Sequence, residues 1–249
     1  MARAIRIVGS YLSPYVRKAL VFLEAKRLDY EIDPIVPFFG DDRFSRLSPL
    51  RRVPVLVDDR VTLCDSSVIC QYLEDRWPEP SLYPRDVAAR ARARWLEEFA
   101  DTRMGEVFVW RLFHQRVIRP YVFGEPTDEA VVARVLAEDV PAVLDYLEAQ
   151  LPREGHACGE LSIADVAIAC FFRNAAFARF EIDAGRWPRT ASLVARTLGG
   201  EAFRRLAPFE ELLLRTPLRE HRAALARLGA PLSEETVGSE SARRGALAV

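Results

Sequence analysis

The chain has 249 residues, half of them apolar, and its 35 Lys and Arg nearly balance its 36 Asp and Glu. A net charge of −1 lacks the long-range field that steers a protein onto a polyanion, so nucleic acid is not an expected partner. The four cysteines form no Cys-x-x-Cys pair, so we expect a reduced, cytoplasmic protein that holds no metal. No segment has the roughly 18 consecutive apolar residues of a membrane span, so we expect no membrane association.

The first third of the chain alternates strand and helix signals. Period-two runs predict strands, and apolar residues at helical spacing predict helices. In chain order the predicted elements are a strand at 5–9, a helix from Pro14, a strand at 28–36, a short helix ending near 48–49, a hairpin of 53–57 and 61–63, and a helix at 66–77. This order predicts a small α/β unit in which helices cover a mixed sheet.

A proline-rich segment from Pro78 to Pro84 separates this unit from a second half that has only helix signals. Ser162 and Asp165 have the spacing of a capping box and open an apolar helix, which we interpret as a structural feature. The predicted organisation is an α/β domain over 1–78, a linker over 79–85, an all-helical domain over 86–232 and a disordered tail over 233–249, where Ser, Gly, Glu and Arg predominate.

Four short motifs carry a resemblance to a known family. They are SPYVRKAL from Ser13, VPVL from Val53, DSS from Asp65 and LSIADV from Leu161. With this order and spacing, the chain resembles the cytosolic glutathione transferases of the serine, bacterial-like type over roughly residues 4 to 215. The resemblance implies a thioredoxin-like α/β domain that binds glutathione and an all-α C-terminal domain.

Ser13 is the candidate catalytic residue. It precedes Pro14 at a predicted helix start, where free N–H groups and the positive end of the helix dipole favour a nearby anion such as a thiolate. A free thiol has a pKa of about 8.5, so its activation requires stabilisation of the ionised form. Ser13 as a plain helix cap is the alternative. Ser10 and Tyr11 are the competing hydroxyls.

The resemblance also implies a binding set for the rest of glutathione. Pro54 lies inside a β-type run, where a proline conflicts with strand pairing. A cis Val53–Pro54 peptide resolves this conflict and would turn the Val53 backbone toward the tripeptide. An ordinary edge-strand proline is the alternative. Asp65 and Ser66 would bind the γ-glutamyl group, although either is also a good helix cap. Arg52 would pair with the glycyl carboxylate, and an exposed arginine without a partner is the alternative.

The implied activity is that of a glutathione transferase. Ser13 would stabilise the glutathione thiolate for attack on a small hydrophobic electrophile in a conjugation, dehalogenation or isomerisation, with glutathione as co-substrate and a homodimer as the assembly. A binding or scaffold protein on the same fold is the alternative, because a fold does not determine an activity.

Overall fold

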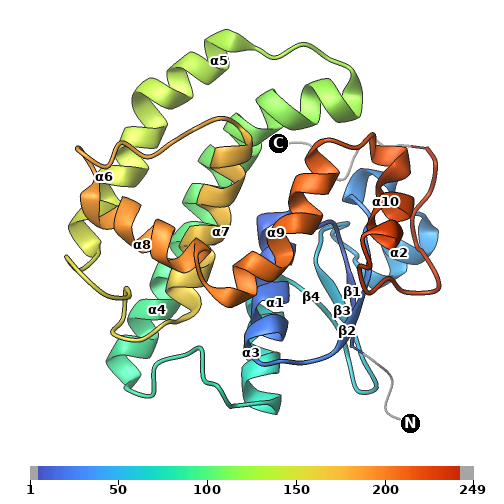
Figure 1. Ribbon diagram of the computed structural model, residues 1–249, viewed down its shortest axis with the longest axis horizontal. Helices are drawn as coiled ribbons and strands as arrows, with labels where there is room; N and C mark the ends of the chain where they lie inside the picture. Colours follow the sequence, from blue (N-terminus) through green and yellow to red (C-terminus); the bar gives the residue numbers. More distant parts are fainter. Residues whose placement is uncertain (1–4, 242–249) are drawn as a thin grey trace. The chain divides into compact units, whose positions relative to one another are not determined.

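The sheet of the first unit has four strands. In the computed structural model, which describes residues 5–241, these are β1 (Ile5–Val8), β2 (Tyr30–Asp33), β3 (Val55–Val57) and β4 (Thr62–Cys64). Their order is β2-β1-β3-β4 (Figure 1). β1 pairs with β2 in parallel, whereas β3 is antiparallel to both β1 and β4. This is the mixed sheet of a thioredoxin-like domain, as predicted.

Helices cover both faces of this sheet. α1 (Pro14–Ala25) and α3 (Ser66–Arg76) pack against each other on one face (Figure 1). A 3-10 turn, η1 (Pro37–Phe39), and the short helix α2 (Asp42–Leu47) belong to the other face, where Phe44 packs with Val8 and Val55. Because side chains alternate along a strand, the register partners Ile7 and Leu56 point the opposite way, and both are fully buried.

The end of the chain belongs to the same unit as the sheet. The chain divides into one unit made of residues up to Pro80 and those from Arg205 onward, and a second unit made of Ser81–Arg204. α9 (Glu201–Leu214) crosses this boundary and leads to η4 (Leu218–Glu220) and α10 (His221–Arg227). Residues 205–232 therefore group with the α/β unit, whereas the sequence placed them in the helical domain.

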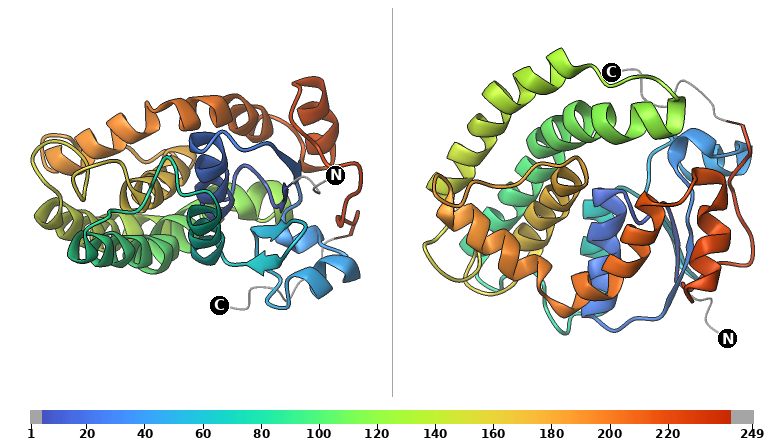
Figure 2. Two further views of the ribbon diagram at one scale, coloured as in Figure 1. Left: turned by 90° about the horizontal axis from the view of Figure 1, so that it is seen from below. Right: turned by 45° about the horizontal axis from the view of Figure 1, so that its top comes forward.

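The described residues beyond Ser233 also differ from expectation. Residues 233–241 follow a defined path beside β2 and α2 (red segment in Figures 1 and 2), with Val237 only 5% exposed in the core. The sequence suggested disorder because this stretch is mostly polar, but one buried valine and a series of backbone hydrogen bonds hold it. The remainder of the predicted tail, 242–249, lies outside the described residues.

The second unit is helical. Its elements are α4 (Val87–Phe99), the π-helix η2 (Ala100–Phe123), α5 (Glu129–Arg134), the π-turn η3 (Val135–Asp139), α6 (Val140–Gln150), α7 (Ile163–Phe177) and α8 (Pro188–Leu198). α7 is the most buried of them and contacts α4, η2 and α8. Among the described helices, none has the length and apolarity needed to cross a membrane.

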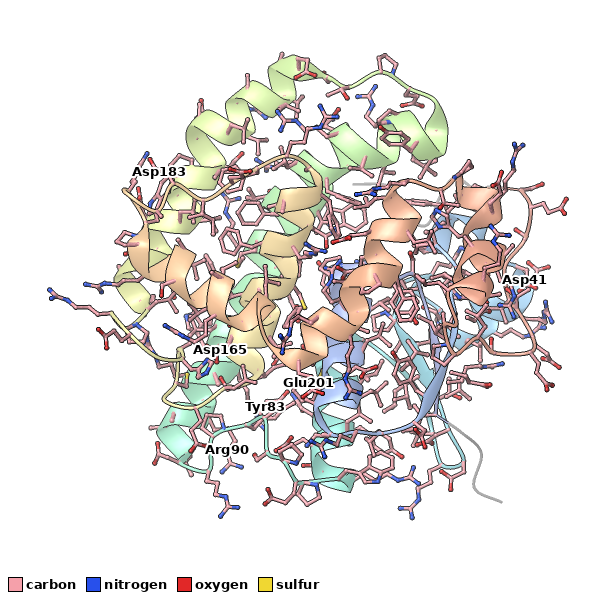
Figure 3. The ribbon with its side chains drawn as sticks, viewed as in Figure 1. Asp41, Tyr83, Arg90, Asp165, Asp183 and Glu201 are labelled. Carbon is pink, nitrogen blue, oxygen red and sulfur yellow. The ribbon has the colours of Figure 1, made fainter. Side chains whose placement is uncertain are left out.

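The start of α7 shows how a local motif supports this unit. Asp165, labelled in Figure 3, is fully buried and accepts hydrogen bonds from the Ser162 amide at 2.9 Å and the Ala157 amide at 2.8 Å. The bond from the Ser162 amide, together with the bond that the Ser162 side chain accepts from the Asp165 backbone, forms the predicted capping box. A carboxylate with several donors satisfies backbone groups that burial would otherwise leave unpaired.

Candidate functional site

Ser13 is the N-cap of α1. Its backbone is extended, with φ −80° and ψ 127°, and its Oγ accepts from the Val16 amide at 3.4 Å. Pro14 follows at the first helical position, where its missing N–H costs nothing. The Ser13 side chain is only partly buried, so a hydroxyl lies at the positive end of a twelve-residue helix with part of its surface open to solvent.

The two competing hydroxyls are turned inward. Ser10 is 2% exposed, and its Oγ accepts from the Leu12 amide at 3.3 Å. Tyr11 is 1% exposed and packs on Phe209, with ring centroids 5.0 Å apart. Burial raises the pKa of the Tyr11 phenol above its ordinary value of 10, which keeps it protonated. Of these three residues, Ser13 is therefore the most exposed.

Val53 lies just before β3, beyond the last pair of the β1–β3 ladder, Val8–Val55. The Val53–Pro54 peptide is cis, in agreement with the expectation from the sequence. Among the described residues neither the amide nor the carbonyl of Val53 has a backbone hydrogen-bond partner. Both groups are therefore free to pair with an extended peptide.

Gly9 brings the Val53 turn close to the start of α1. It has a φ of +147°, and a Cβ at this position would lie 2.5 Å from Val16 Cγ2 and 3.0 Å from Val53 Cβ. A side chain has no room there, so only glycine allows the β1–α1 turn and the residue-53 turn to approach this closely. The segments that carry Ser13 and Val53 are thereby placed side by side.

Asp65 has an unusual backbone conformation immediately before α3. Its φ is +80° and its ψ is 126°, a region that L side chains rarely occupy, and such conformations cost on the order of 1–3 kcal/mol. Its Oδ1 accepts from the Ser67 amide at 2.9 Å and the Val68 amide at 3.2 Å, which makes it the helix cap. Ser66 follows as the first helical residue and is 3% exposed. Backbone strain at a cap is found chiefly where function requires it.

Lys18 links the two helix starts. Its side chain is fully buried, and its Nζ donates to the Ser67 Oγ at 3.0 Å. The helices that carry Ser13 and Asp65 at their N-terminal ends are thus connected directly.

Arg52 is exposed, and its backbone is fixed by one side chain. The Ser48 Oγ accepts from the Arg52 amide at 2.9 Å and donates to the Arg52 carbonyl at 2.8 Å. Its neighbour Arg51 has a φ of +50°, and its guanidinium donates to the Ser45 Oγ and to the carbonyls of Pro37 and Gly40. The Arg52 side chain is thus presented to solvent from a well-supported loop.

Comparisons with known proteins identify the family. A model described as the glutathione S-transferase N-terminal domain matches residues 7–81. The chain is 31% identical over 210 residues to the uncharacterized GST-like protein YibF of Escherichia coli strain K12, a match that covers 82% of this chain and 98% of that protein.

The chain belongs to the glutathione S-transferase family.

Other relatives agree with this assignment. Glutathione S-transferase 3 of Zea mays is 30% identical over 167 residues, 65% of this chain and 73% of that protein. The crystal structure of a glutathione S-transferase from Rhodospirillum rubrum F11 superposes with a TM-score of 0.77 at 28% identity and covers 88% of this chain and 99% of that one. Apo human glutathione S-transferase T1-1, at 22% identity and a TM-score of 0.74, supports the fold.

The six predicted site residues all lie in the first unit. Ser13 heads α1, Asp65 and Ser66 head α3, and 52–54 lead into β3. Among residues 5–241, no group of three or more His, Cys, Asp or Glu side chains is arranged to hold a metal ion.

Two supports of the site were missed at the sequence level. The Arg17 amide donates to the Ser13 carbonyl at 2.9 Å, and the fully buried Arg17 side chain pairs with Glu210 and donates to the Tyr11 carbonyl at 3.2 Å. The other support is the segment around Val237, described below. Arg17 lies 193 residues from Glu210, and no local pattern reports a contact at that separation. An isolated valine in a polar stretch is the one available signal for the second support.

Proposed function

We propose that this glutathione S-transferase binds glutathione on its α/β unit and activates the thiol with Ser13. In this proposal the Val53 backbone pairs with the cysteinyl segment of the tripeptide, and Asp65 and Ser66 bind the γ-glutamyl group. Arg52 pairs with the glycyl carboxylate. The family assignment and the geometry around these residues support the proposal.

The start of α3 is the observation that carries the binding proposal. One carboxylate oxygen of Asp65, Oδ1, accepts the two hydrogen bonds of the helix cap. The side chain is exposed, and in this proposal its other oxygen, Oδ2, accepts from the ligand ammonium. The helix N-terminus directly beside it favours the α-carboxylate of the same γ-glutamyl group. The γ-glutamyl group carries an ammonium and a carboxylate on the same carbon. These two charges match an oxygen that binds a cation beside a helix end that binds an anion.

Ser13 suits the activation of a thiol. Lowering a thiol pKa from about 8.5 to about 6.5 requires about 2.7 kcal/mol. A hydrogen bond from a hydroxyl to a charged acceptor supplies about 1.5–3 kcal/mol, and a helix N-terminus adds about 0.3–1 kcal/mol. These two contributions reach the required value without a general base.

The reaction follows from a thiolate held in this way. The thiol proton passes to solvent, while Ser13 keeps its own proton and directs it at the sulfur. The sulfur lone pair forms a C–S bond with an electrophilic carbon of a small hydrophobic substrate. In a conjugation by displacement, the leaving group departs with the electrons of the broken bond; in an addition, the new carbanion takes a proton from water. Ser13 forms no covalent bond and keeps its proton throughout.

The proposal is tested by turnover with glutathione across a panel of aryl halides, unsaturated carbonyl compounds and maleyl isomers. Ser13→Ala should lower kcat by about 10²-fold or more, the range of a lost transition-state hydrogen bond. Ser10→Ala is the matched control and should leave kcat within a few-fold. Retention of full activity by Ser13→Ala would refute the role of Ser13, and failure of the wild-type protein to bind millimolar glutathione would favour the scaffold alternative. The homodimer and the cytoplasmic location remain predictions.

A further inference from the structure

The described end of the chain adds an extra strand-like segment to the sheet of the first unit. We call residues 231–239 the C-terminal strap. The Ile32 amide donates to the Pro231 carbonyl at 2.7 Å, and the Ser233 amide donates to the Ile32 carbonyl at 3.0 Å. These bonds form a parallel bridge between Ile32 and Leu232 on the free edge of β2, so the strap covers an edge that would otherwise expose unpaired backbone groups.

One residue anchors the strap in the core. The Val237 side chain is 5% exposed and packs in the cluster of Val8, Phe44 and Val55, which fills the space between the sheet and α2. The Val237 amide donates to Asp33 Oδ2 at 2.7 Å. A polar segment with one buried apolar residue and a buried hydrogen bond has a defined position.

The strap also holds the segment of residues 37–44. The Asp41 amide donates to the Val237 carbonyl at 2.9 Å, and the Ser239 amide donates to the Phe39 carbonyl at 2.6 Å. Asp41 is labelled in Figure 3, at the start of α2. Arg43 extends this contact by donating to the Thr236 carbonyl at 2.6 Å. Between these bonds the strap forms an antiparallel bridge to residue 40.

The held segment has little stability of its own. η1 has three residues, none buried, and no side-chain cap, and α2 has six residues of which only Phe44 is buried. Isolated helices shorter than about 12–15 residues are marginal in water, so these elements depend on tertiary contacts. The backbone bonds to the strap supply such contacts.

The held segment in turn supports the residues proposed to bind glutathione. Arg51 donates to the Pro37 carbonyl at 3.3 Å and to the Gly40 carbonyl at 2.9 Å. Ser48, which directly follows α2, fixes the backbone of Arg52 through two hydrogen bonds. Val53 comes next in the chain. A continuous series of contacts therefore runs from the strap through η1 and α2 to the backbone of residues 51–53.

We propose that the C-terminal strap is a positioning element of the glutathione site. It holds η1 and α2 in the conformation that presents Arg52 and the Val53 backbone to the tripeptide. Because coupling between two binding events is reciprocal, bound glutathione must stabilise the docked strap by the same factor as the docked strap strengthens glutathione binding. This inference rests on the function proposed above.

The test compares the full-length protein with two variants, a chain that ends at Ser233 and the milder Val237→Ala. The shortened chain keeps the Ile32 bridge but loses the contacts to Asp33, Phe39 and Asp41. Glu240→Gln, an exposed position just beyond the strap, is the matched control. Amide hydrogen exchange is measured for every protein with and without glutathione, together with glutathione affinity, KM and kcat.

We expect exchange at residues 37–53 to rise at least tenfold in the shortened chain and severalfold in Val237→Ala, while β1 and β3 keep their protection. The KM for glutathione should rise by a similar factor with kcat changed less than twofold, which a general loss of folding would not produce. In the full-length protein, saturating glutathione should slow exchange in the strap. Unchanged exchange at 37–53, or faster exchange with unaltered glutathione affinity, would overturn the inference. Absence of glutathione binding by the full-length protein would instead refute the proposed function, so the two failures are distinguishable.

Discussion

Asp65→Asn separates the two roles that the structure gives to this residue. The Asp65 Oδ1 accepts from the Ser67 and Val68 amides and caps α3, and an asparagine Oδ1 does the same. The substitution removes the negative charge and replaces Oδ2, the oxygen proposed to accept from the ligand ammonium, with an NH2 donor. We therefore expect glutathione binding to weaken while the protein remains as stable as the wild type.

The magnitude follows from the exposure of the side chain. A hydrogen bond to a charged group contributes about 1.5–3 kcal/mol, and because Asp65 is exposed, solvent screening reduces this to about 1–2 kcal/mol. This range corresponds to a 5- to 30-fold loss of affinity, since a tenfold change is about 1.4 kcal/mol. Asparagine ranks with aspartate as a cap, so the free energy of unfolding should change by less than about 0.5 kcal/mol.

Calorimetric titration with glutathione and urea unfolding measure the two quantities. Asp128→Asn is the matched control, because Asp128 caps α5 through bonds of 3.1 Å to the Ala130 and Val131 amides and is remote in sequence from the proposed binding set. It should leave the affinity unchanged. Wild-type affinity in Asp65→Asn would refute the assignment of this carboxylate to the ligand, and an affinity loss of equal size in Asp128→Asn would show that the effect is not local.

Three further predictions concern stability. Glu210→Gln should lower the free energy of unfolding by about 3–5 kcal/mol in urea titrations, because it removes the charge of the carboxylate that pairs with the fully buried Arg17 guanidinium. Replacing both residues with methionine should restore most of the loss. Asp165→Ala should cost about 2–4 kcal/mol in the same assay, because several buried donors lose one acceptor; an effect below 1 kcal/mol would contradict its structural role. Burial raises the pKa of the Asp33 carboxyl above its ordinary value of 3.8, against the lowering effects of the Val237 amide, the Thr236 hydroxyl, Arg222 and Arg6. The folded state thus holds the Asp33 proton more tightly than the unfolded chain does, so the contribution of Asp33 to stability is complete below pH 3.8 and declines as the pH rises through the raised pKa. As the pH rises through this range, Asp33→Asn should gain stability relative to the wild type in unfolding measurements. A stability difference between the two proteins that is constant with pH would contradict this prediction.

Much of the α/β unit was predictable because its signals are local. The strand before Gly9, the helix opened by Pro14 and the hairpin after Pro54 follow from short patterns of apolar residues, proline and turn residues. The start of α3 at Asp65 follows from capping chemistry in the same way, whereas its positive φ does not, because aspartate rarely adopts that conformation.

The rest depends on contacts between distant parts of the chain. Helical periodicity predicted helices in 205–232 but not the unit against which they pack. Arg17 and Glu210 are unremarkable in sequence, and only the fold makes them a buried pair. Val237 lies in a stretch whose composition predicts disorder, and its burial depends on a space between α2 and the sheet that no local pattern describes.

The most direct test of the account is the ionisation of bound glutathione. Ultraviolet absorbance of the thiolate, followed against pH in the binary complex, gives the pKa of the bound thiol in the wild-type protein and in Ser13→Ala. We expect a wild-type pKa about two units below the free value of about 8.5, and a rise of about one to two units in Ser13→Ala. Superimposable titration curves for the two proteins would contradict the central claim that the Ser13 hydroxyl stabilises the thiolate.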